Sequence, residues 1–357
     1  MPPSPEGGVQ STENQEGKAL HAVRAPSSVA IVLPLDGAAA PAAVAVQNGF
    51  LAAWYATPPS ERPTVTFHPF AGGAVEMAYQ GAVESGASFI VGPLGKEELQ
   101  TLAKRGAFPR PTLALNYLPD GAPAPTQLYQ FGLAPTDEAH QSAKQAWLDG
   151  RIRAFVVTPK DEWGQRIRQA FRTQWEAIGG TTQYPIDLDE QPEALLTAIA
   201  EVRGRATYYK PGEDFIFLAA PSEWAHRLVP VLQQTGMSVY ATSHILTGTP
   251  QDAELSGIHV LEMPWMASPS PVDARLRAEI AQQWPTHFVT YRRLYALGVD
   301  AFRLVGVVQQ LESNANARLQ GATGSLALDN KRCIVRQGVW AHMEGERLLP
   351  LSNTRMP

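Results

Sequence analysis

Short runs of consecutive apolar residues alternate with segments in which apolar residues recur three or four positions apart. Each such segment follows an apolar run after a short turn. Strands that alternate with helices pair in parallel, with helices covering both faces of the sheet. We therefore expect an α/β protein built from parallel sheets. The predicted strands are Val29–Leu35, Val65–Phe70, Ser88–Pro93, Thr112–Asn116, Ala154–Pro159, Phe215–Ala220 and Ser238–Ser243.

Two helices carry the strongest amphipathic pattern. Asp161 can accept hydrogen bonds from the free N–H groups of the first of them, which ends at Gly179-Gly180. A helix near Glu193–Val202 follows further on. The second strong helix runs from about Thr290 to Leu311, after both groups of strands are complete. The chain must therefore return from one group of strands to the other.

The strands are too many for one small sheet and fall into two groups, which favours two Rossmann-like lobes with a cleft between them. Several crossovers between lobes form a hinge, and a hinge permits closure around a ligand. We expect one lobe from residues 28–133 plus 266–326, and the other from 134–265 plus 327–357. Residues 1–27 are rich in Pro, Gly, Gln, Ser and Glu, which predicts a disordered tail.

Composition excludes several classes of function. The formal net charge of the 357-residue chain is -5, and no cluster of Lys and Arg is present, so nucleic acid is not an expected partner. No stretch approaches the roughly 20 apolar residues of a membrane helix. The single cysteine, Cys333, excludes an intrachain disulfide, and we expect it to be a small buried apolar residue.

Motifs that carry catalysis or bind cofactors are missing from the sequence. It has no Gly-rich phosphate loop, no Gly-x-Gly-x-x-Gly after the first strand, no Gly-x-Ser-x-Gly and no His-Glu-x-x-His. Acid pairs such as Asp187/Asp189 lie at strand ends or in loops, where a solvated carboxylate is the simplest interpretation. We therefore predict no enzyme activity, no catalytic residue, no cofactor and no metal site.

A cleft, if present, should be lined by residues at the carboxyl ends of the strands, where open α/β sheets bind ligands. Some of these residues can serve the fold instead of a ligand: Gly92-Pro93 can make a sharp turn, Trp163 can pack in the core, and Asn116 and Ser243 can cap backbone groups. The candidates are Leu35, Gly92, Pro93, Leu94, Asn116, Thr158, Trp163, Ala220, Ser243 and Trp265.

Short segments in a fixed order give the chain a family resemblance. It resembles the C-terminal domain of the LppC/LpoA lipoproteins, outer-membrane activators of class A penicillin-binding proteins, and more broadly the type 1 periplasmic binding protein fold. The matching segments are Val91–Leu94, Pro111–Asn116, Asp161–Arg166, Val239–Ser243, Glu262–Trp265, Arg293–Asp300, Gly321–Gly324 and Leu328–Asp329.

The resemblance implies a non-enzymatic periplasmic module that activates a class A penicillin-binding protein in peptidoglycan synthesis. The full-length precursor would be attached to the outer membrane by a lipid anchor. This chain has no signal peptide and no lipid-attachment cysteine near Met1, and it lacks the helical-repeat domain of the larger members, so we expect a mature fragment or a short member. The alternative is a solute-binding protein that closes on a small ligand between its lobes.

Amino-acid-binding relatives of this fold hold the carboxylate of the ligand with hydroxyl side chains at the start of the helix after the third strand. Here that stretch is Gly95-Lys96-Glu97-Glu98. Two carboxylates would repel an anionic ligand, although Lys96 offsets one of them. We therefore expect free amino acids of the leucine type to be poor ligands.

Overall fold

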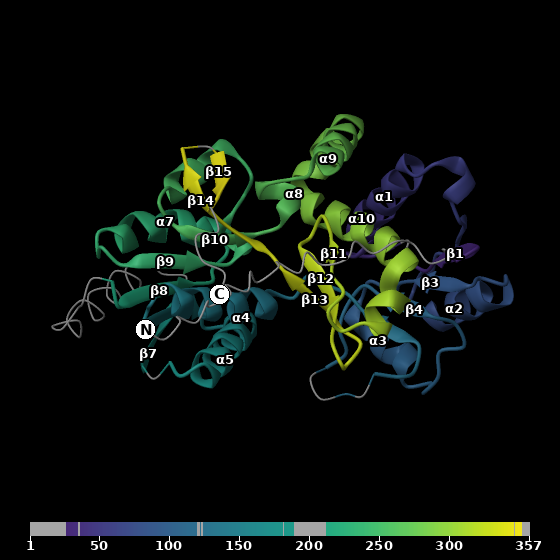
Figure 1. Ribbon diagram of the computed structural model, residues 1–357, viewed down its shortest axis with the longest axis horizontal. Helices are drawn as coiled ribbons and strands as arrows, with labels where there is room; N and C mark the ends of the chain where they lie inside the picture. Colours follow the sequence, from purple (N-terminus) through teal and green to yellow (C-terminus); the bar gives the residue numbers. More distant parts are fainter. Residues whose placement is uncertain are drawn as a thin grey trace, which may run out of the picture.

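The computed structural model describes residues 26–34, 36–119, 122, 124–180, 182–188, 212–345 and 347–351. Two mainly parallel sheets lie side by side, each covered by its own helices, and a smaller sheet lies between them (Figure 1). The α/β fold class is therefore confirmed. Leu35, the predicted helix at 193–202 and residues 1–25 of the predicted tail lie outside the described residues.

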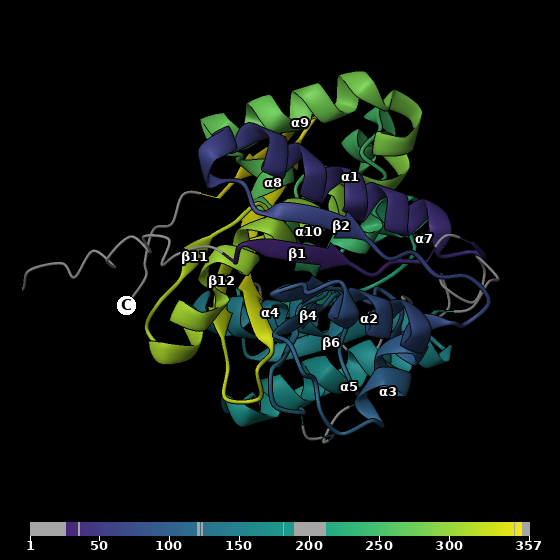
Figure 2. The same cartoon turned by 90° about the vertical axis from the view of Figure 1, so that its right-hand side faces the viewer.

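The first sheet has five parallel strands in the order β2-β1-β3-β4-β5. Its central strands are buried on both faces, which explains their continuous apolar runs. Figure 2 shows α1 on one face and α2 and α3 on the other. The elements are β1 (Ser28–Ile31), α1 (Ala40–Ala56), η1 (Pro59–Glu61), β2 (Thr64–Phe67), α2 (Val75–Glu84), β3 (Phe89–Val91), α3 (Lys96–Ala103), β4 (Thr112–Ala114) and β5 (Leu128–Gln130).

The second sheet has the order β15-β14-β10-β9-β8-β6-β7, and only its last two strands, β14 and β15, run antiparallel to their neighbours. Its elements are α4 (Pro135–Leu148), β6 (Arg153–Pro159), α5 (Glu162–Ala177), β7 (Thr182–Leu188), β8 (Asp214–Leu218), α7 (Ser222–Gln233), β9 (Ser238–Ala241), η2 (Ser243–Ile245), η3 (Pro250–Leu255), β10 (His259–Glu262), β14 (Val339–Glu344) and β15 (Arg347–Pro350).

The chain passes between the two sheets three times: after β5, after β10, and between β13 and β14. The small antiparallel sheet, β11 (Leu319–Gln320), β12 (Ser325–Leu328) and β13 (Ile334–Gln337), belongs to this region. Helices α8 (Pro264–Ala267), α9 (Pro271–Gln283) and α10 (Pro285–Ser313) follow the second crossover. The predicted division of residues 266–357 between two lobes stays a prediction.

Helix α10 consists of two helical segments on either side of a kink. The first segment begins at Pro285 and ends at the kink at Tyr291, whose φ of -116° and ψ of 21° are not helical. The second segment follows Tyr291 and matches the helix that the sequence predicts from about Thr290 to Leu311. Beyond this break it packs on α1 and on the first sheet: Leu297, Ala301 and Leu304 share a core with Val29 and other strand residues. The sequence pattern thus predicts the second segment and misses the short one before the kink.

The structure tests the predictions made for Asp161 and Cys333. Asp161 caps α5 as predicted, since its side chain accepts a hydrogen bond from the N–H of Gly164 at 2.7 Å. Cys333, predicted to be buried, is partly exposed, because it ends the turn between β12 and β13, in which Asn330 and Lys331 are exposed. Its Sγ accepts a hydrogen bond from Nε2 of Gln130 at 3.3 Å. Within the described residues no helix combines the length and apolarity needed to cross a membrane.

Candidate functional site at the junction of the two sheets

Four of the predicted cleft residues lie together at the end of β3. Gly92 and Pro93 are buried, and Gly92 has a φ of 112°. A Cβ on Gly92 would overlap the carbonyl oxygen of Val32, so this close approach of two strands requires glycine. Asn116 Nδ2 donates to the Leu94 carbonyl oxygen at 3.0 Å. The side chain of Asn116 is thus engaged by the backbone of this turn.

The predicted residues of the second sheet are more scattered. Thr158 is buried, and its Oγ1 accepts hydrogen bonds from Nε and Nη2 of Arg168 at 3.0 and 2.8 Å. Ala220 lies in the core with α7. Trp265 is fully buried in a cluster contributed by α1, α9 and α10. Thr158 and Ala220 thus lie at the ends of the neighbouring strands β6 and β8, whereas Trp265 packs among helices.

Trp163 and Ser243 are the predicted residues that lie close to a cluster of charges. Trp163 is partly buried, with its ring 5.4 Å from the ring of His244. Ser243 is buried and donates two hydrogen bonds to Glu138 in the first turn of α4, from its N–H at 2.7 Å and from Oγ at 2.8 Å. Burial lowers the pKa of His244, with Glu138 opposing that shift.

Arg293 of α10 extends this cluster to a second buried carboxylate. Its Nη2 donates to the carbonyl oxygen of Ser243 at 2.8 Å, and its Nε donates to Glu262 Oε1 at 3.2 Å, while Nη2 also contacts the other oxygen of Glu262. The Glu262 side chain is 1% exposed and that of Arg293 22% exposed. Burial opposes the charge of Arg293, but the attraction of Glu262 outweighs it and raises the pKa of the guanidinium.

Arg292, the preceding residue, binds the loop that follows β9. Its two Nη atoms donate to the carbonyl oxygens of Leu246, at 3.2 Å, and of Thr247. The same loop is held from within by Asp252, which accepts hydrogen bonds from the N–H groups of Thr247 and Gly248 at 2.9 and 2.7 Å. The loop thus receives donors from α10 on one side and an internal acceptor on the other.

Asp300, two turns further along α10, organises the turn before β12. Its carboxylate is fully buried and accepts hydrogen bonds from Ala322 N at 2.8 Å and from Thr323 N and Oγ1, both at 2.7 Å. A Cβ on Gly321 would lie 2.5 Å from Asp300 Oδ2. Glycine at position 321 therefore allows the backbone to wrap around the carboxylate.

Arg336 of β13 connects two of the crossovers through hydrogen bonds. Its Nε donates to the Gly132 carbonyl oxygen at 3.0 Å, in the first crossover, and its Nη1 donates to the carbonyl oxygen of Thr323 at 3.3 Å. Gln141 of α4 completes the link, because its amide donates to the Arg336 carbonyl at 3.0 Å and accepts from the N–H of Gly338 at 2.9 Å. The crossovers are thus bonded to each other as well as to the lobes.

The junction brings together four of the segments that carry the family resemblance: Val239–Ser243, Glu262–Trp265, Arg293–Asp300 and Gly321–Gly324. The sequence predicted Ser243 and Trp265 as site residues but missed Glu138, Glu262, Arg293 and Asp300. Charged residues next to apolar strands, or on a helix otherwise rich in apolar residues, were the available signal.

The chemistry of the junction is structural. Its carboxylates accept hydrogen bonds from backbone N–H groups, hydroxyls and arginines of the chain itself, which leaves each charge compensated where it is buried. Among the described residues, no group of three or more His, Cys, Asp or Glu side chains is arranged to hold a metal ion. Such an arrangement fixes the relative positions of helices and strands.

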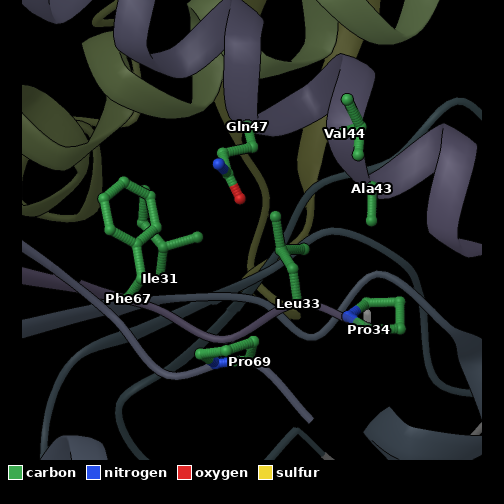
Figure 3. Close-up of a pocket in the computed structure, with 8 residues that line it drawn as sticks. All are labelled: Ile31, Leu33, Pro34, Ala43, Val44, Gln47, Phe67 and Pro69. Atoms are coloured by element: carbon green, nitrogen blue, oxygen red, sulfur yellow. The ribbon is translucent and has the colours of Figure 1, made fainter. Parts of the chain in front are cut away.

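A small apolar cavity lies elsewhere, on the first sheet. It occupies about 50 Å³ between β1, β2 and α1, and Leu33, Val44 and Phe67 contribute apolar walls (Figure 3). The side chain of Gln47 also lines it. Sites for drug-sized ligands measure about 300–1,000 Å³, so this cavity suits no more than a single small group.

The start of α3, where amino-acid-binding relatives hold a carboxylate, contains a carboxylate of the protein itself. Glu98 lies in the first turn of α3, and a Cβ on Gly95, the N-cap residue, would overlap the Glu98 carboxylate. The side chain of Glu98 thus lies against the positive end of the helix dipole. An anionic ligand at this position would meet a like charge.

Sequence relatives match nearly all of this chain. The family model described as "LppC putative lipoprotein" matches residues 12–345. Penicillin-binding protein activator LpoA of Haemophilus influenzae is 27% identical over 330 residues, which cover 92% of this chain and 56% of the relative. The same-named protein of Vibrio antiquarius is 25% identical over 351 residues, covering 88% and 57%. The chain thus spans just over half the length of these curated relatives.

Solved structures show the same similarity in three dimensions. The LpoA (YraM) C-domain from Haemophilus influenzae, "a regulator of PBP1A", aligns with a TM-score of 0.76 and 25% identity, covering 91% of this chain and 100% of that one. A "putative branched-chain amino acid ABC transporter" from Chromobacterium violaceum aligns with a TM-score of 0.72 and 30% identity, covering 88% and 99%. The expected type 1 periplasmic-binding-protein-like fold is confirmed. Since the family model matches far more than half of its residues, the chain belongs to the LppC lipoprotein family.

Proposed function

We propose that this chain is a non-enzymatic regulatory module that activates a class A penicillin-binding protein in peptidoglycan synthesis. The observation that carries the proposal is the match of 88% and 92% of the chain to relatives named penicillin-binding protein activators. The solved C-domain of one such activator, a regulator of PBP1A, aligns over its whole length. The relatives are longer, and this chain spans just over half of their length.

The junction supports a role through contact with a protein and not through chemistry. Its charged side chains Glu138, Glu262, Arg293 and Asp300 are engaged with one another or with the backbone. A catalytic group must be within reach of a substrate and poised to exchange a proton or form a bond. We further propose that the module works in the periplasm, attached to the outer membrane through a lipid anchor in the full-length precursor.

Binding of a small solute is the second candidate function. Its support is the 30% identity to the Chromobacterium violaceum protein, which extends over 99% of that protein. Glu98 argues against an amino-acid ligand, since its carboxylate lies at the start of α3 where a ligand carboxylate would bind. The main proposal requires neither a small ligand nor closure of the two lobes around one.

Titration into the periplasmic portion of a class A penicillin-binding protein from the same organism tests the main proposal. Calorimetry should show saturable binding, and the rate of glycan strand synthesis should rise with the bound fraction. A heat-unfolded sample of the same chain is the control for non-specific effects. Absence of binding at tens of micromolar, or binding without a change in rate, would contradict the proposal.

A thermal-shift series tests the second candidate. Millimolar leucine should leave the melting temperature of the natural chain unchanged, because a ligand raises it only when bound to the folded state. Glu98→Ser removes the carboxylate and supplies a hydroxyl at the start of α3. A leucine-dependent rise in the natural chain would favour the solute-binding function, whereas a rise in the variant alone would show that Glu98 excludes the ligand.

A further inference from the structure

Helix α10 belongs to the first sheet by packing, yet it bonds to the second sheet through two adjacent arginines. From Leu297 onward its apolar side chains share a core with β1, β3 and β4. Gly298 approaches α1 so closely that a Cβ there would overlap the Val46 carbonyl oxygen. Arg292 and Arg293 directly follow the break at Tyr291. Their guanidinium groups reach the loop after β9 and the end of β10, which are parts of the second sheet.

The acceptors of these arginines are mainly backbone carbonyl oxygens of the second sheet. They include the carbonyl oxygens of Ser243, Leu246 and Thr247, at and just beyond the 3-10 helix η2. Carbonyl groups at the end of a helix have no partner within it. Arg292 therefore supplies donors to the carbonyl oxygens of Leu246 and Thr247, whereas that of Ser243 accepts both from Arg293 and from the N–H of Leu246 at 3.1 Å.

The loop after β9 is held firmly on its own side of the junction. Glu138 of α4 binds Ser243 at its start, and Asp252 binds Thr247 and Gly248 near its end. Arg292 lies so close to Gly248 that a Cβ at that position would overlap its guanidinium. A rotation of the lobes would thus break the arginine bonds, since the loop is already bonded to its own lobe.

We propose that Arg292 and Arg293 form an interlobe latch that keeps the two lobes in one relative orientation. Closure of the lobes about the three crossovers would separate Arg293 from Glu262 and leave a buried carboxylate without its cation. Separating a buried ion pair is strongly unfavourable, because each charge then lies buried without its partner. The latched orientation therefore dominates the population. The chain therefore presents a fixed surface, in contrast to the closure that the crossovers alone led us to expect. This inference does not depend on the identity of the partner.

Distance measurement between two spin labels tests the latch. Met77→Cys on α2 and Gln169→Cys on α5 place exposed labels on opposite lobes once the native thiol is removed by Cys333→Ser. The otherwise natural chain should give one narrow distribution. Arg293→Met combined with Glu262→Gln opens the latch at its ion pair by removing both charges of that pair together, and should broaden or divide the distribution.

An ion pair within the second sheet supplies the matched control. Arg153 and Asp214 join β6 to β8, with side chains 25% and 1% exposed, closely similar to the latch pair. Arg153→Met with Asp214→Asn should lower the melting temperature and leave the interlobe distance unchanged. If this control broadens the distribution as much as the latch variant does, the latch is not specific and the proposal fails.

Two further results would overturn the proposal: a broad or divided distribution in the natural chain, or an unchanged one when the latch is opened. Gly248→Ala provides an independent perturbation should the double variant not fold, because it displaces the guanidinium of Arg292 and keeps every charge. It should broaden the distribution in the same direction. A narrow distribution in a folded Gly248→Ala protein would likewise refute the latch.

Discussion

Replacement of Asp300 by alanine should lower the free energy of unfolding more than replacement of any exposed carboxylate. Asp300 accepts hydrogen bonds from Ala322 N and from Thr323 N and Oγ1, all within 2.8 Å. A buried donor without an acceptor costs about 1–3 kcal/mol. Arg303 keeps its bond to Asp273, and the turn at 321–324 can relax, so we expect a net loss of about 3–5 kcal/mol.

Urea unfolding followed by tryptophan fluorescence measures this loss directly. Domains have a total stability of about 5–15 kcal/mol, so the midpoint of the Asp300→Ala variant should fall by a large fraction. Asp300→Asn keeps the shape but turns one acceptor into a donor, and should lie between the natural protein and Asp300→Ala. Asp161→Ala removes a single cap bond to Gly164, with an expected cost of about 1 kcal/mol.

The difference in unfolding free energy between Asp300→Ala and Asp161→Ala tests the role of burial and of the number of donors. Both substitutions delete a carboxylate that accepts backbone hydrogen bonds, and they differ in burial and in the number of donors left behind. If Asp300→Ala costs no more than Asp161→Ala, the three donors at the turn find other partners or water. The claim that Asp300 organises the junction would then be refuted.

Three further predictions concern other parts of the molecule. Burial raises the pKa of Asp137 to about 6, above its ordinary 3.8, so its contribution to stability is present below pH 3.8 and lost as the pH rises through about 6. Compared with Asp137→Asn, the natural protein should therefore lose up to about 3 kcal/mol of unfolding free energy by about pH 7; a pH-independent difference would contradict this. Partial burial raises the pKa of the Cys333 thiol to about 11. At about pH 8 this thiol should therefore react with a disulfide reagent on the order of 100-fold more slowly than in the urea-unfolded chain. Equal rates in the folded and unfolded chains would rule out the raised pKa. Gly92→Ala should cost about 2–5 kcal/mol of unfolding free energy in urea, since its φ is 112° and a Cβ would overlap Val32. Gly86→Ala, with a φ of 80° and open space around the position, should cost only about 1–2 kcal/mol. Equal losses from the two substitutions would disprove the steric argument.

Local patterns in the sequence were sufficient for most of the fold. The apolar runs of β1, β3, β4, β6, β8 and β9 and the capped helix α5 were predictable, because period and capping depend on neighbours a few residues apart. The short helical segment of α10 before the kink at Tyr291 was not, because it has too few residues to establish an apolar period. The family segments were also readable, although nothing in the sequence showed that four of them meet.

The charged residues of the junction were the least predictable part of the molecule. Sequence topology alone placed Ser243 at a strand end, but its partner Glu138 lies 105 residues away and resembles any acidic residue in the first turn of a helix. Glu262 and Arg293 are likewise indistinguishable in sequence from solvated charges. The sequence by itself determined the α/β alternation, the two groups of strands and the lack of catalytic motifs. Only the tertiary structure decided which charges are buried and paired, because desolvation and ion pairing depend on distances between segments that the chain brings together only when it folds.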